Sequence, residues 1–177
     1  MAVDDLSRLS LAEIVALAEA QKRRPVEQWH PERCGDSAMR IARDGSWHHE
    51  GRPIARPELV RLFASILRRE PDGSYALVTP AERLAIAVED APFVAVEMKC
   101  GGEGRARTLV FRLNTGELVV AGPDHPLKLD GARPYLAVRA GLDALIARPV
   151  YYELVELGLD DGGVWSGGAF FALGGGA

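Results

Sequence analysis

Two arginines precede the starts of predicted helices and are the side chains best suited to hold an anion. Arg56 and Arg148 occur in identical Ile-Ala-Arg-Pro strings, at residues 54–57 and 146–149. Proline is favoured at the first helical position, so each arginine precedes a turn whose backbone N–H groups lack helical partners. A guanidinium beside such amides can hold a phosphate or a carboxylate. The alternative is a salt bridge, either between the two copies or to an acid such as Glu153.

Aromatic side chains near these positions can complete a binding site. Tyr151 and Tyr152 follow Arg148 in the first turn of the second predicted helix. A tyrosine can bury its ring while its hydroxyl keeps a polar partner. We therefore expect one of the pair to fill the core and the other to stack on a ligand ring or to hydrogen-bond a ligand. Trp47 is a second candidate for stacking on a ligand ring.

Acidic residues and a histidine lie in predicted loops and suggest a second kind of chemistry. Glu89 and Asp90 stand between two apolar strands, where they can bind a cation, act as acid and base, or cap a turn. Asp124 and His125 precede Pro126, where they form either an acid–histidine pair or a bend. These residues make a hydrolase, using acid–base or metal-assisted catalysis, an alternative to simple binding.

The common catalytic and metal-binding motifs are absent from the chain. It has no phosphate loop, no HExxH and no GxSxG pattern. The glycines at 101–104 precede a predicted strand, so their amides lack the helix dipole that favours an anion. Adjacent His48 and His49 point to opposite faces of a strand, and Cys34 and Cys100 form no C-x-x-C pair. We therefore expect no metal and no cofactor.

Composition disfavours several classes of partner. The 177 residues carry a formal net charge of -4, and the sequence pI is about 5.6. No global basic field therefore attracts nucleic acid. No apolar stretch approaches the roughly 20 residues of a membrane span, and the N-terminus lacks the pattern of an export signal. The cysteine pattern fits a reducing compartment, so we expect a cytoplasmic protein.

Two helices are predicted in the first half of the chain from capping residues and hydrophobic periodicity. Ser10 and Glu13 form a capping box for a helix at 11–24. Pro57 opens a second helix, expected at 57–69, whose apolar residues recur with helical spacing. Both helices are therefore expected to pack one face against a core.

The rest of the chain is expected to be mostly strands. Alternating apolar residues and turn signals predict strands or hairpins at 38–50, 75–78, 84–88, 94–98, 108–113, 117–121, 135–138 and 170–173. A long polar loop is expected at 122–133. A third helix is expected at 147–157, ended by Gly158 in the left-handed conformation that a helix end often requires.

The order of these elements predicts an internal duplication. Both halves are expected to show a strand pair, the Ile-Ala-Arg-Pro helix start, an apolar helix, an acid–glycine turn and an aromatic strand. The predicted fold class is therefore α+β, with two similar strand-helix-strand copies and mostly antiparallel sheets. The N-terminal helix and lead-in occupy residues 1–28, the first copy 29–88, and the second copy 89–177.

Several strings of the chain resemble the uncharacterised bacterial family known as domain of unknown function 1285. The resemblance spans residues 29–173 and rests on residues 34–36, 41–47, 88–93, 124–127, 145–152 and 165–168. It implies a duplicated α+β fold whose second copy is similar to a pleckstrin-homology-like partial barrel. It also implies a ligand pocket between the copies and a role in signal transduction, but no established activity. The pocket candidates that it indicates are Glu89, Asp90, His125, Arg148 and Tyr151.

Three functional hypotheses follow, and binding is favoured over catalysis. The first is a binding or sensing module for a small anionic, nucleotide-like ligand in a cleft between the copies. Arg56 and Arg148 would contact the anion, and Tyr151 or Trp47 would stack on the ring. The second is the hydrolase that uses His125 and the loop acids. The third is an adaptor for an unknown protein partner, with an exposed sheet edge or the N-terminal helix as its interface.

Overall fold

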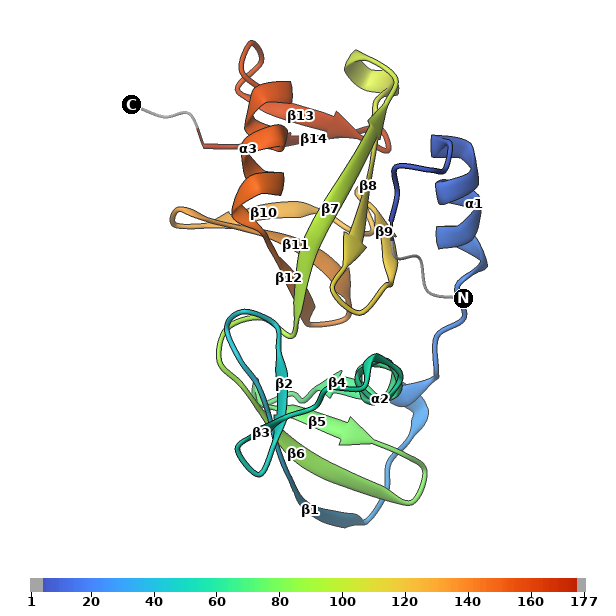
Figure 1. The fold of residues 1–177 in the computed structure, drawn as a ribbon, viewed down its shortest axis with the longest axis vertical. Coiled ribbons are helices and arrows are strands. Elements are labelled where there is room, and N and C mark those ends of the chain that lie inside the picture. Colours follow the sequence, from blue (N-terminus) through green and yellow to red (C-terminus); the bar gives the residue numbers. More distant parts are fainter. Residues whose placement is uncertain (1–4, 175–177) are drawn as a thin grey trace. The chain divides into compact units, whose positions relative to one another are not determined.

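The structure is a computed structural model, and it describes residues 5–174. The predicted α+β class and the two related sheets are confirmed. The described chain divides into two compact units (Figure 1). The N-terminal unit comprises Lys22–Pro92 and the turn Ala140–Leu142, and the C-terminal unit comprises the chain up to Gln21, Phe93–Arg139 and the chain from Asp143. The helix at the N-terminus therefore belongs to the C-terminal unit.

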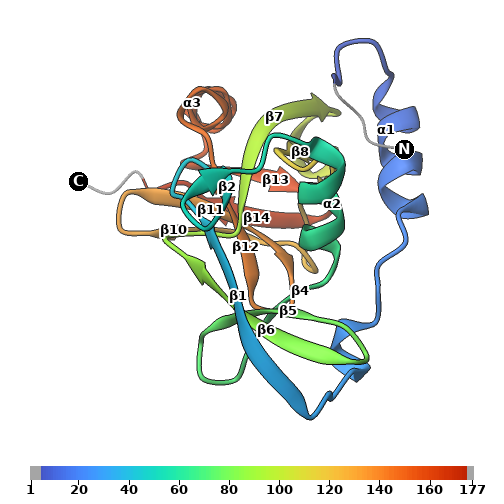
Figure 2. The ribbon, with the colours of Figure 1, turned by 60° about the horizontal axis from the view of Figure 1, so that its bottom comes forward.

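The N-terminal unit is built on a six-stranded mixed sheet. Its strands lie in the order β3-β2-β1-β6-β5-β4, and the central pair β1 and β6 runs side by side in parallel (Figure 2). The neighbouring strands pair antiparallel. The elements of this unit are η1 (Val26–Gln28), β1 (Arg33–Ile41), β2 (Trp47–His49), β3 (Arg52–Pro53), α2 (Pro57–Ser65), β4 (Leu67–Arg69), β5 (Tyr75–Val78) and β6 (Glu82–Val88).

The C-terminal unit contains a second six-stranded sheet, curled into a half-barrel (Figure 1). The strand order is β10-β11-β12-β7-β8-β9, and β12 and β7 form its parallel central pair. The last helix and a terminal hairpin follow the sixth strand. The elements are β7 (Phe93–Gly101), η2 (Gly104–Ala106), β8 (Thr108–Leu113), β9 (Leu118–Val120), β10 (Leu127–Asp130), β11 (Arg133–Arg139), β12 (Leu142–Ile146), α3 (Arg148–Leu157), β13 (Gly163–Ser166) and β14 (Ala169–Ala172).

The two sheets share one topology, but the repeated string does not mark equivalent positions in them. Each sheet consists of two three-stranded meanders joined by a parallel pair between its first and sixth strands. Helix α2 follows the third strand of its sheet, whereas α3 follows the sixth. The register that aligned the two Ile-Ala-Arg-Pro strings is therefore wrong. The proline of the string favours a helix start through local backbone geometry. This preference does not depend on which strand of the sheet precedes the helix.

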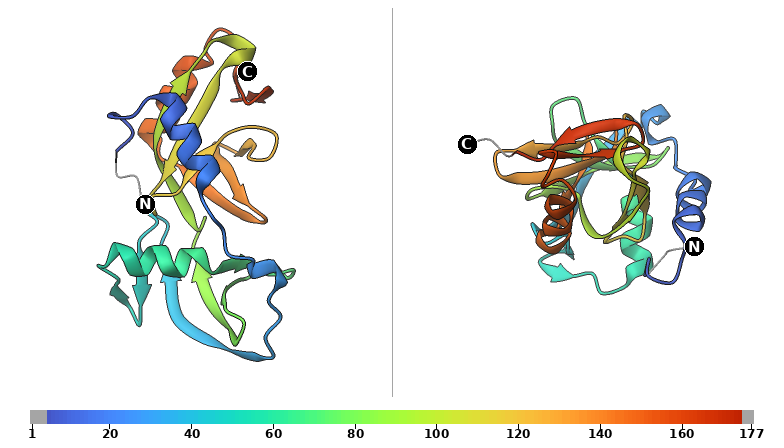
Figure 3. Two further views of the ribbon diagram at one scale, coloured as in Figure 1. Left: turned by 90° about the vertical axis from the view of Figure 1, so that its right-hand side faces the viewer. Right: turned by 90° about the horizontal axis from the view of Figure 1, so that it is seen from above.

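The N-terminal helix α1 (Leu11–Ala20) covers strands of the C-terminal unit (Figure 3). The predicted capping box is confirmed: the Glu13 N–H donates to Ser10 Oγ at 3.2 Å, and the Ser10 N–H donates to Glu13 Oε2 at 2.7 Å. Ile14 of the helix packs with Leu118 and other apolar residues in a buried cluster. Such burial, more than helix propensity, stabilises a helix of this length.

Two helix ends differ from prediction. Helix α1 stops at Ala20 and α2 at Ser65, so both predicted helices were too long. Residues 67–69 instead form the edge strand β4, which pairs with β5 around the Asp72-Gly73 turn. Sheet pairing supplies these residues with backbone partners and overrides their local helical periodicity.

The C-terminal half differs from prediction at several places. The expected loop at 122–133 contains β10, and neither β12 nor β13 was predicted. Gly158 ends α3 with φ of -105°, outside the left-handed region. Its lack of a side chain is needed for another reason, because a Cβ there would lie 2.9 Å from the Gly163 carbonyl oxygen.

Candidate functional site

A pocket lined by arginines opens on the N-terminal unit. Its volume is about 510 Å³, within the range of small-ligand sites. The lining residues come from η1 and the segment after it, from β4 and the turn after it, and from β6. Ala140, in the turn Ala140–Leu142 that belongs to this unit, completes the lining. The full set of lining residues is Glu27, His30, Pro31, Arg68, Arg69, Glu70, Pro71, Arg83 and Ala140.

Strand pairing explains how these arginines reach one pocket. Arg68 is the cross-strand partner of Ala76, and Arg69 is the partner of Tyr75. Adjacent residues of a strand point to opposite faces, but β4 is the edge of the sheet. Side chains from both of its faces can therefore border the same pocket. The pairing through β5 places Arg83 on the same face as Arg68.

A buried carboxylate organises one side of the pocket. Glu70 is 8% exposed and accepts hydrogen bonds from Arg68 Nε at 2.8 Å and from Arg83 Nη1 at 3.1 Å. Burial raises the pKa of Glu70, but the hydrogen bonds and charges of Arg68 and Arg83 outweigh it, so the pKa is lowered. Glu70 is therefore ionised at neutral pH, which suits an anchor for the two guanidinium groups better than a general acid.

Arg68 also ties the lead-in segment to the sheet. Its Nη1 donates to the carbonyl oxygens of Val26 at 2.9 Å and Trp29 at 2.7 Å. The side chain is only 14% exposed. These bonds satisfy two backbone carbonyls and hold the η1 segment, which carries part of the pocket wall, against β4.

Arg69 lies on the other face and is held by different contacts. Its guanidinium carbon sits 4.5 Å from the centroid of the Tyr75 ring, and Nη1 donates to the Tyr75 hydroxyl. A second, longer hydrogen bond of 3.5 Å reaches the Gly141 carbonyl oxygen. Arg69 itself is exposed. Its charge is therefore accessible while its orientation is constrained.

Arg83 has a thiol beside it. Its Nη2 lies 3.4 Å from the sulfur of Cys34, an exposed residue of the neighbouring strand β1. The Arg83 side chain is 41% exposed. Hydrogen bonding and charge from Cys34, followed by those from Glu70, raise the pKa of Arg83. Arg83 is thus held by hydrogen bonds to both Glu70 and the Cys34 sulfur.

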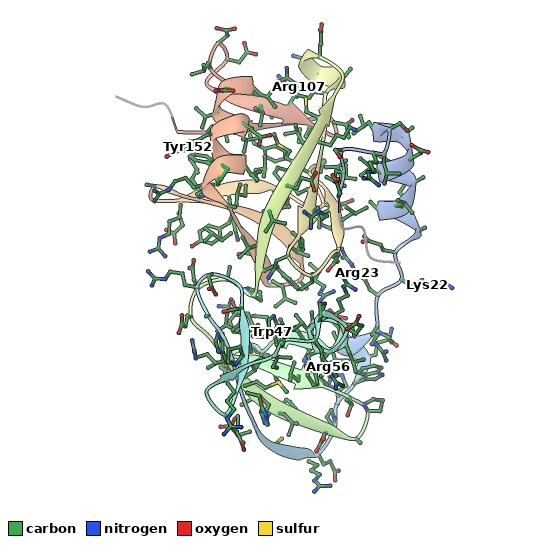
Figure 4. All side chains as sticks on the ribbon, viewed as in Figure 1. Lys22, Arg23, Trp47, Arg56, Arg107 and Tyr152 are labelled. Atoms are coloured by element: carbon green, nitrogen blue, oxygen red, sulfur yellow. The ribbon has the colours of Figure 1, made fainter. Side chains whose placement is uncertain are left out.

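The predicted site residues of the N-terminal unit lie outside this pocket. Arg56 is the exposed N-cap residue of α2, and Trp47 is 2% exposed and stacks on Phe63 with ring centroids 6.4 Å apart (Figure 4). The Trp47 indole N–H has no hydrogen-bond partner within residues 5–174. Trp47 therefore belongs to the core.

The predicted acids follow the end of β6. Glu89 accepts a hydrogen bond from Arg40 and another, of 2.9 Å, from the backbone N–H of Arg43. The Arg43 amide has the largest effect and lowers the pKa of Glu89; burial raises it by less, and the hydrogen bond and charge of Arg40 lower it further, so the pKa is lowered overall. Glu89 thus joins the β1–β2 turn to the end of β6. Asp90 is half-buried in the bend that follows.

The other predicted site residues belong to the C-terminal unit. Arg148 is exposed in the first turn of α3. Tyr151 is half-buried, and its hydroxyl donates to the Leu173 carbonyl at 3.3 Å, while Tyr152 is 60% exposed (Figure 4). His125 Nδ1 lies 3.1 Å from the Ala137 carbonyl oxygen, a contact that fixes the loop before β10. None of these residues lines the arginine pocket.

Two of the pocket arginines, Arg68 and Arg69, were missed because the predicted second helix included them. Basic residues are common in the last turn of a helix, so Arg68 and Arg69 fitted that prediction. The usable signal was the Pro71-Asp72-Gly73 turn together with the strand that follows it, a pattern typical of a hairpin.

The described part of the chain contains no group of three or more metal-ligating side chains placed to hold an ion. Among its helices, none combines the length and apolar character needed to cross a bilayer.

The fold and the pocket define a two-domain α+β protein with duplicated sheets. The chain belongs to the DUF1285 family, a family of unknown function, as the resemblance of its sequence indicated. The N-terminal domain of this family matches residues 24–91, and its C-terminal domain matches residues 92–173. No established function accompanies this family. No curated protein matches the chain.

Two solved structures are similar to the chain. A DUF1285 family protein from Silicibacter pomeroyi DSS-3 shares 47% identity and a TM-score of 0.78, with 90% of this chain and 93% of that chain covered. A DUF1285 family protein from Shewanella baltica OS155 shares 28% identity and a TM-score of 0.57, with 68% of this chain and 92% of that chain covered. Both therefore belong to the same family as this chain.

Proposed function

We propose that the protein is a binding or signalling module for a small anionic molecule, which occupies the arginine pocket of the N-terminal unit. The observation that carries this proposal is one pocket lined by three arginines, two of which pair with a buried carboxylate. Glu70 pairs with Arg68 and Arg83, and this single negative charge offsets only one of the two. Arg69 adds a further positive charge and Glu27 a further negative one, which leaves the pocket an excess of positive charge.

The guanidinium groups keep hydrogen-bond donors for a ligand. Within residues 5–174, the hydrogen bonds of Arg68 use Nε and Nη1, and those of Arg69 use Nη1. The Nη2 groups of both arginines and Nε of Arg69 thus remain available. A planar guanidinium fork matches a carboxylate or phosphate in a bidentate arrangement, and such charge-assisted bonds are strong.

Binding is better supported than hydrolysis. The lowered pKa of Glu70 keeps this carboxylate ionised and paired, so it is poorly suited to donate a proton. Glu89 is engaged by Arg40 and Arg43, and His125 by a backbone carbonyl, so each has a structural role. Arg56 and Arg148 stay predicted anion contacts, each within its own unit.

Calorimetric and thermal-shift titrations of the purified full-length chain with carboxylates, phosphates and nucleotides test the proposal. A ligand at about 100 times its Kd stabilises the folded state by about 2.7 kcal/mol, which raises the unfolding midpoint by about 5 °C or more. Arg69→Ala should abolish the effect. Arg52→Ala is the matched control, because Arg52 is an exposed arginine on β3 at the opposite edge of the same sheet.

Two outcomes would count against this site. If Arg148→Ala removed binding and Arg69→Ala left it unchanged, the ligand would occupy the start of α3 instead. If product formed and His125→Ala abolished it, the hydrolase alternative would replace the binding module.

A further inference from the structure

The pocket offers apolar surface as well as charge. Pro31 is half-buried in its wall, and Pro71 and Ala140 contribute further apolar groups. The ring of Tyr75 packs against the guanidinium of Arg69. The volume of about 510 Å³ greatly exceeds the space that a bare inorganic anion needs and is typical of sites for small organic molecules. A ligand that fills this pocket therefore has an apolar body.

The charge of the pocket limits the charge of the ligand. Two carboxylates, Glu27 and Glu70, line the pocket together with the three arginines and His30, which leaves a formal charge of about +1 when the histidine is counted as neutral. A ligand with a single negative charge neutralises this excess. Each additional negative charge, as in a nucleoside triphosphate, would meet the carboxylates without a guanidinium to balance it, and like charges repel.

We infer that the ligand is an organic monocarboxylic acid with an apolar body, such as an aromatic acid. Its carboxylate pairs with the available donors of Arg69, and its ring lies against the proline and alanine side chains of the wall. This inference rests on the proposed anion-binding function and narrows it to one ligand class. It replaces the nucleotide-like ligand that the aromatic residues of the sequence had suggested.

Calorimetric titrations with four probes test the inference: benzoate, acetate, inorganic phosphate and ATP, all at one ionic strength. Benzoate and acetate share the carboxylate but differ in the ring. Burial of the ring should make benzoate bind about tenfold more tightly than acetate, or better. Benzoate should also bind more tightly than phosphate or ATP.

Two variants assign binding to the pocket. Arg69→Lys keeps the charge but loses the planar fork, so the affinity for benzoate should fall about tenfold. Arg52→Ala should leave it unchanged. Circular dichroism of each variant confirms the native fold. Amide chemical shifts of Arg69, Tyr75 and Ala140 in the wild-type chain should move when benzoate is added, whereas those of exposed Arg148 should stay constant.

The outcomes separate this inference from the proposed function. If phosphate or ATP binds more tightly than benzoate and Arg69→Ala removes that binding, the monocarboxylate inference is overturned and the anion-binding function stands. If benzoate binds but Arg69→Lys and Arg69→Ala have no effect, the pocket assignment is overturned. If none of the four probes binds the folded wild-type chain at millimolar concentration, both proposals are overturned.

Discussion

Arg69 and Tyr75 are cross-strand partners on β4 and β5, and the Arg69 guanidinium carbon lies 4.5 Å from the centroid of the Tyr75 ring. The same arginine also donates a hydrogen bond to the Tyr75 hydroxyl. A cation over an aromatic face is attracted by the ring quadrupole. Because the strand register places Tyr75 opposite Arg69, the exposed Arg69 side chain is held in one orientation. Less conformational entropy of this side chain is therefore lost when it pairs with an anion.

Tyr75→Leu tests whether this orientation matters for binding. The substitution keeps an apolar side chain on β5 but removes the cation–π contact, worth about 0.5–1 kcal/mol at an exposed site, and the hydroxyl acceptor. We expect the affinity for the anion to fall about threefold to tenfold in a calorimetric titration. Tyr152→Leu, at an exposed tyrosine of α3, should have no effect. Equal affinities of the wild type and Tyr75→Leu would show that the stack does not orient Arg69 for binding.

Glu70→Gln tests the buried anchor of the pocket. The substitution leaves Arg68, which is 14% exposed, without its charged partner. Removal of one partner from a buried hydrogen-bonded pair leaves the other incompletely compensated, so the free energy of unfolding should fall by about 1–3 kcal/mol. Urea denaturation measures the change. Glu27→Gln is the control, because exposed Glu27 lines the same pocket, and its effect should stay within about 0.5 kcal/mol.

The pH dependence of stability should also report on Glu70. Its pKa in the folded chain lies below the ordinary value of 4.5. A carboxyl with a lowered folded-state pKa contributes stability above its unfolded pKa and loses that contribution as the pH falls through the folded value. The stability difference between the wild type and Glu70→Gln should therefore be constant above about pH 5 and shrink below it. Urea titrations from pH 7 down to pH 3 measure it, and a difference that grew at low pH would contradict the assigned ion pair.

Gly141→Ala tests the turn that contacts Arg69. Gly141 has φ of +71°, and a Cβ there would lie 2.8 Å from both Cβ and Cγ of Arg69. We expect a loss of about 1–2 kcal/mol in unfolding free energy together with weaker anion binding, because Arg69 must move. Gly131→Ala provides the matched control, since its φ is +60° and a Cβ there would meet no atom within 4 Å. That variant should lose stability alone, and identical binding by both variants would rule out the contact as a constraint on Arg69.

Gln21→Ala tests how α1 is attached to the C-terminal unit. The Gln21 side chain accepts a hydrogen bond from the Leu118 N–H and donates one to the Leu118 carbonyl, each at 2.7 Å, so it pairs with edge strand β9 as a neighbouring strand would. Its loss should cost about 1–2 kcal/mol. Hydrogen exchange at the Leu118 amide should become about tenfold faster. Lys22→Ala, at the next and exposed position, should leave that exchange rate unchanged.

Local features of this protein were predictable because their causes span only a few residues. The capping box of Ser10 and Glu13 begins α1 as predicted, and Pro57 begins α2. The β1–β2 hairpin and the β5 strand also lie where turn residues and alternating apolar residues placed them. In each case the side chains that decide the structure are neighbours in the chain, so the sequence by itself determined these elements and the α+β class.

Tertiary structure decided the features that depend on pairing between distant segments. The parallel pairs β1–β6 and β7–β12 join strands that local patterns cannot connect. The choice between helix and strand at Arg68 and Arg69 was made by pairing with β5, and that choice moved both arginines from a predicted helix end to a pocket. Glu70 became a buried anchor only because Arg68 and Arg83 converge on it from two strands. A buried charge is tolerated where partners compensate its desolvation, and only the folded sheet supplies those partners.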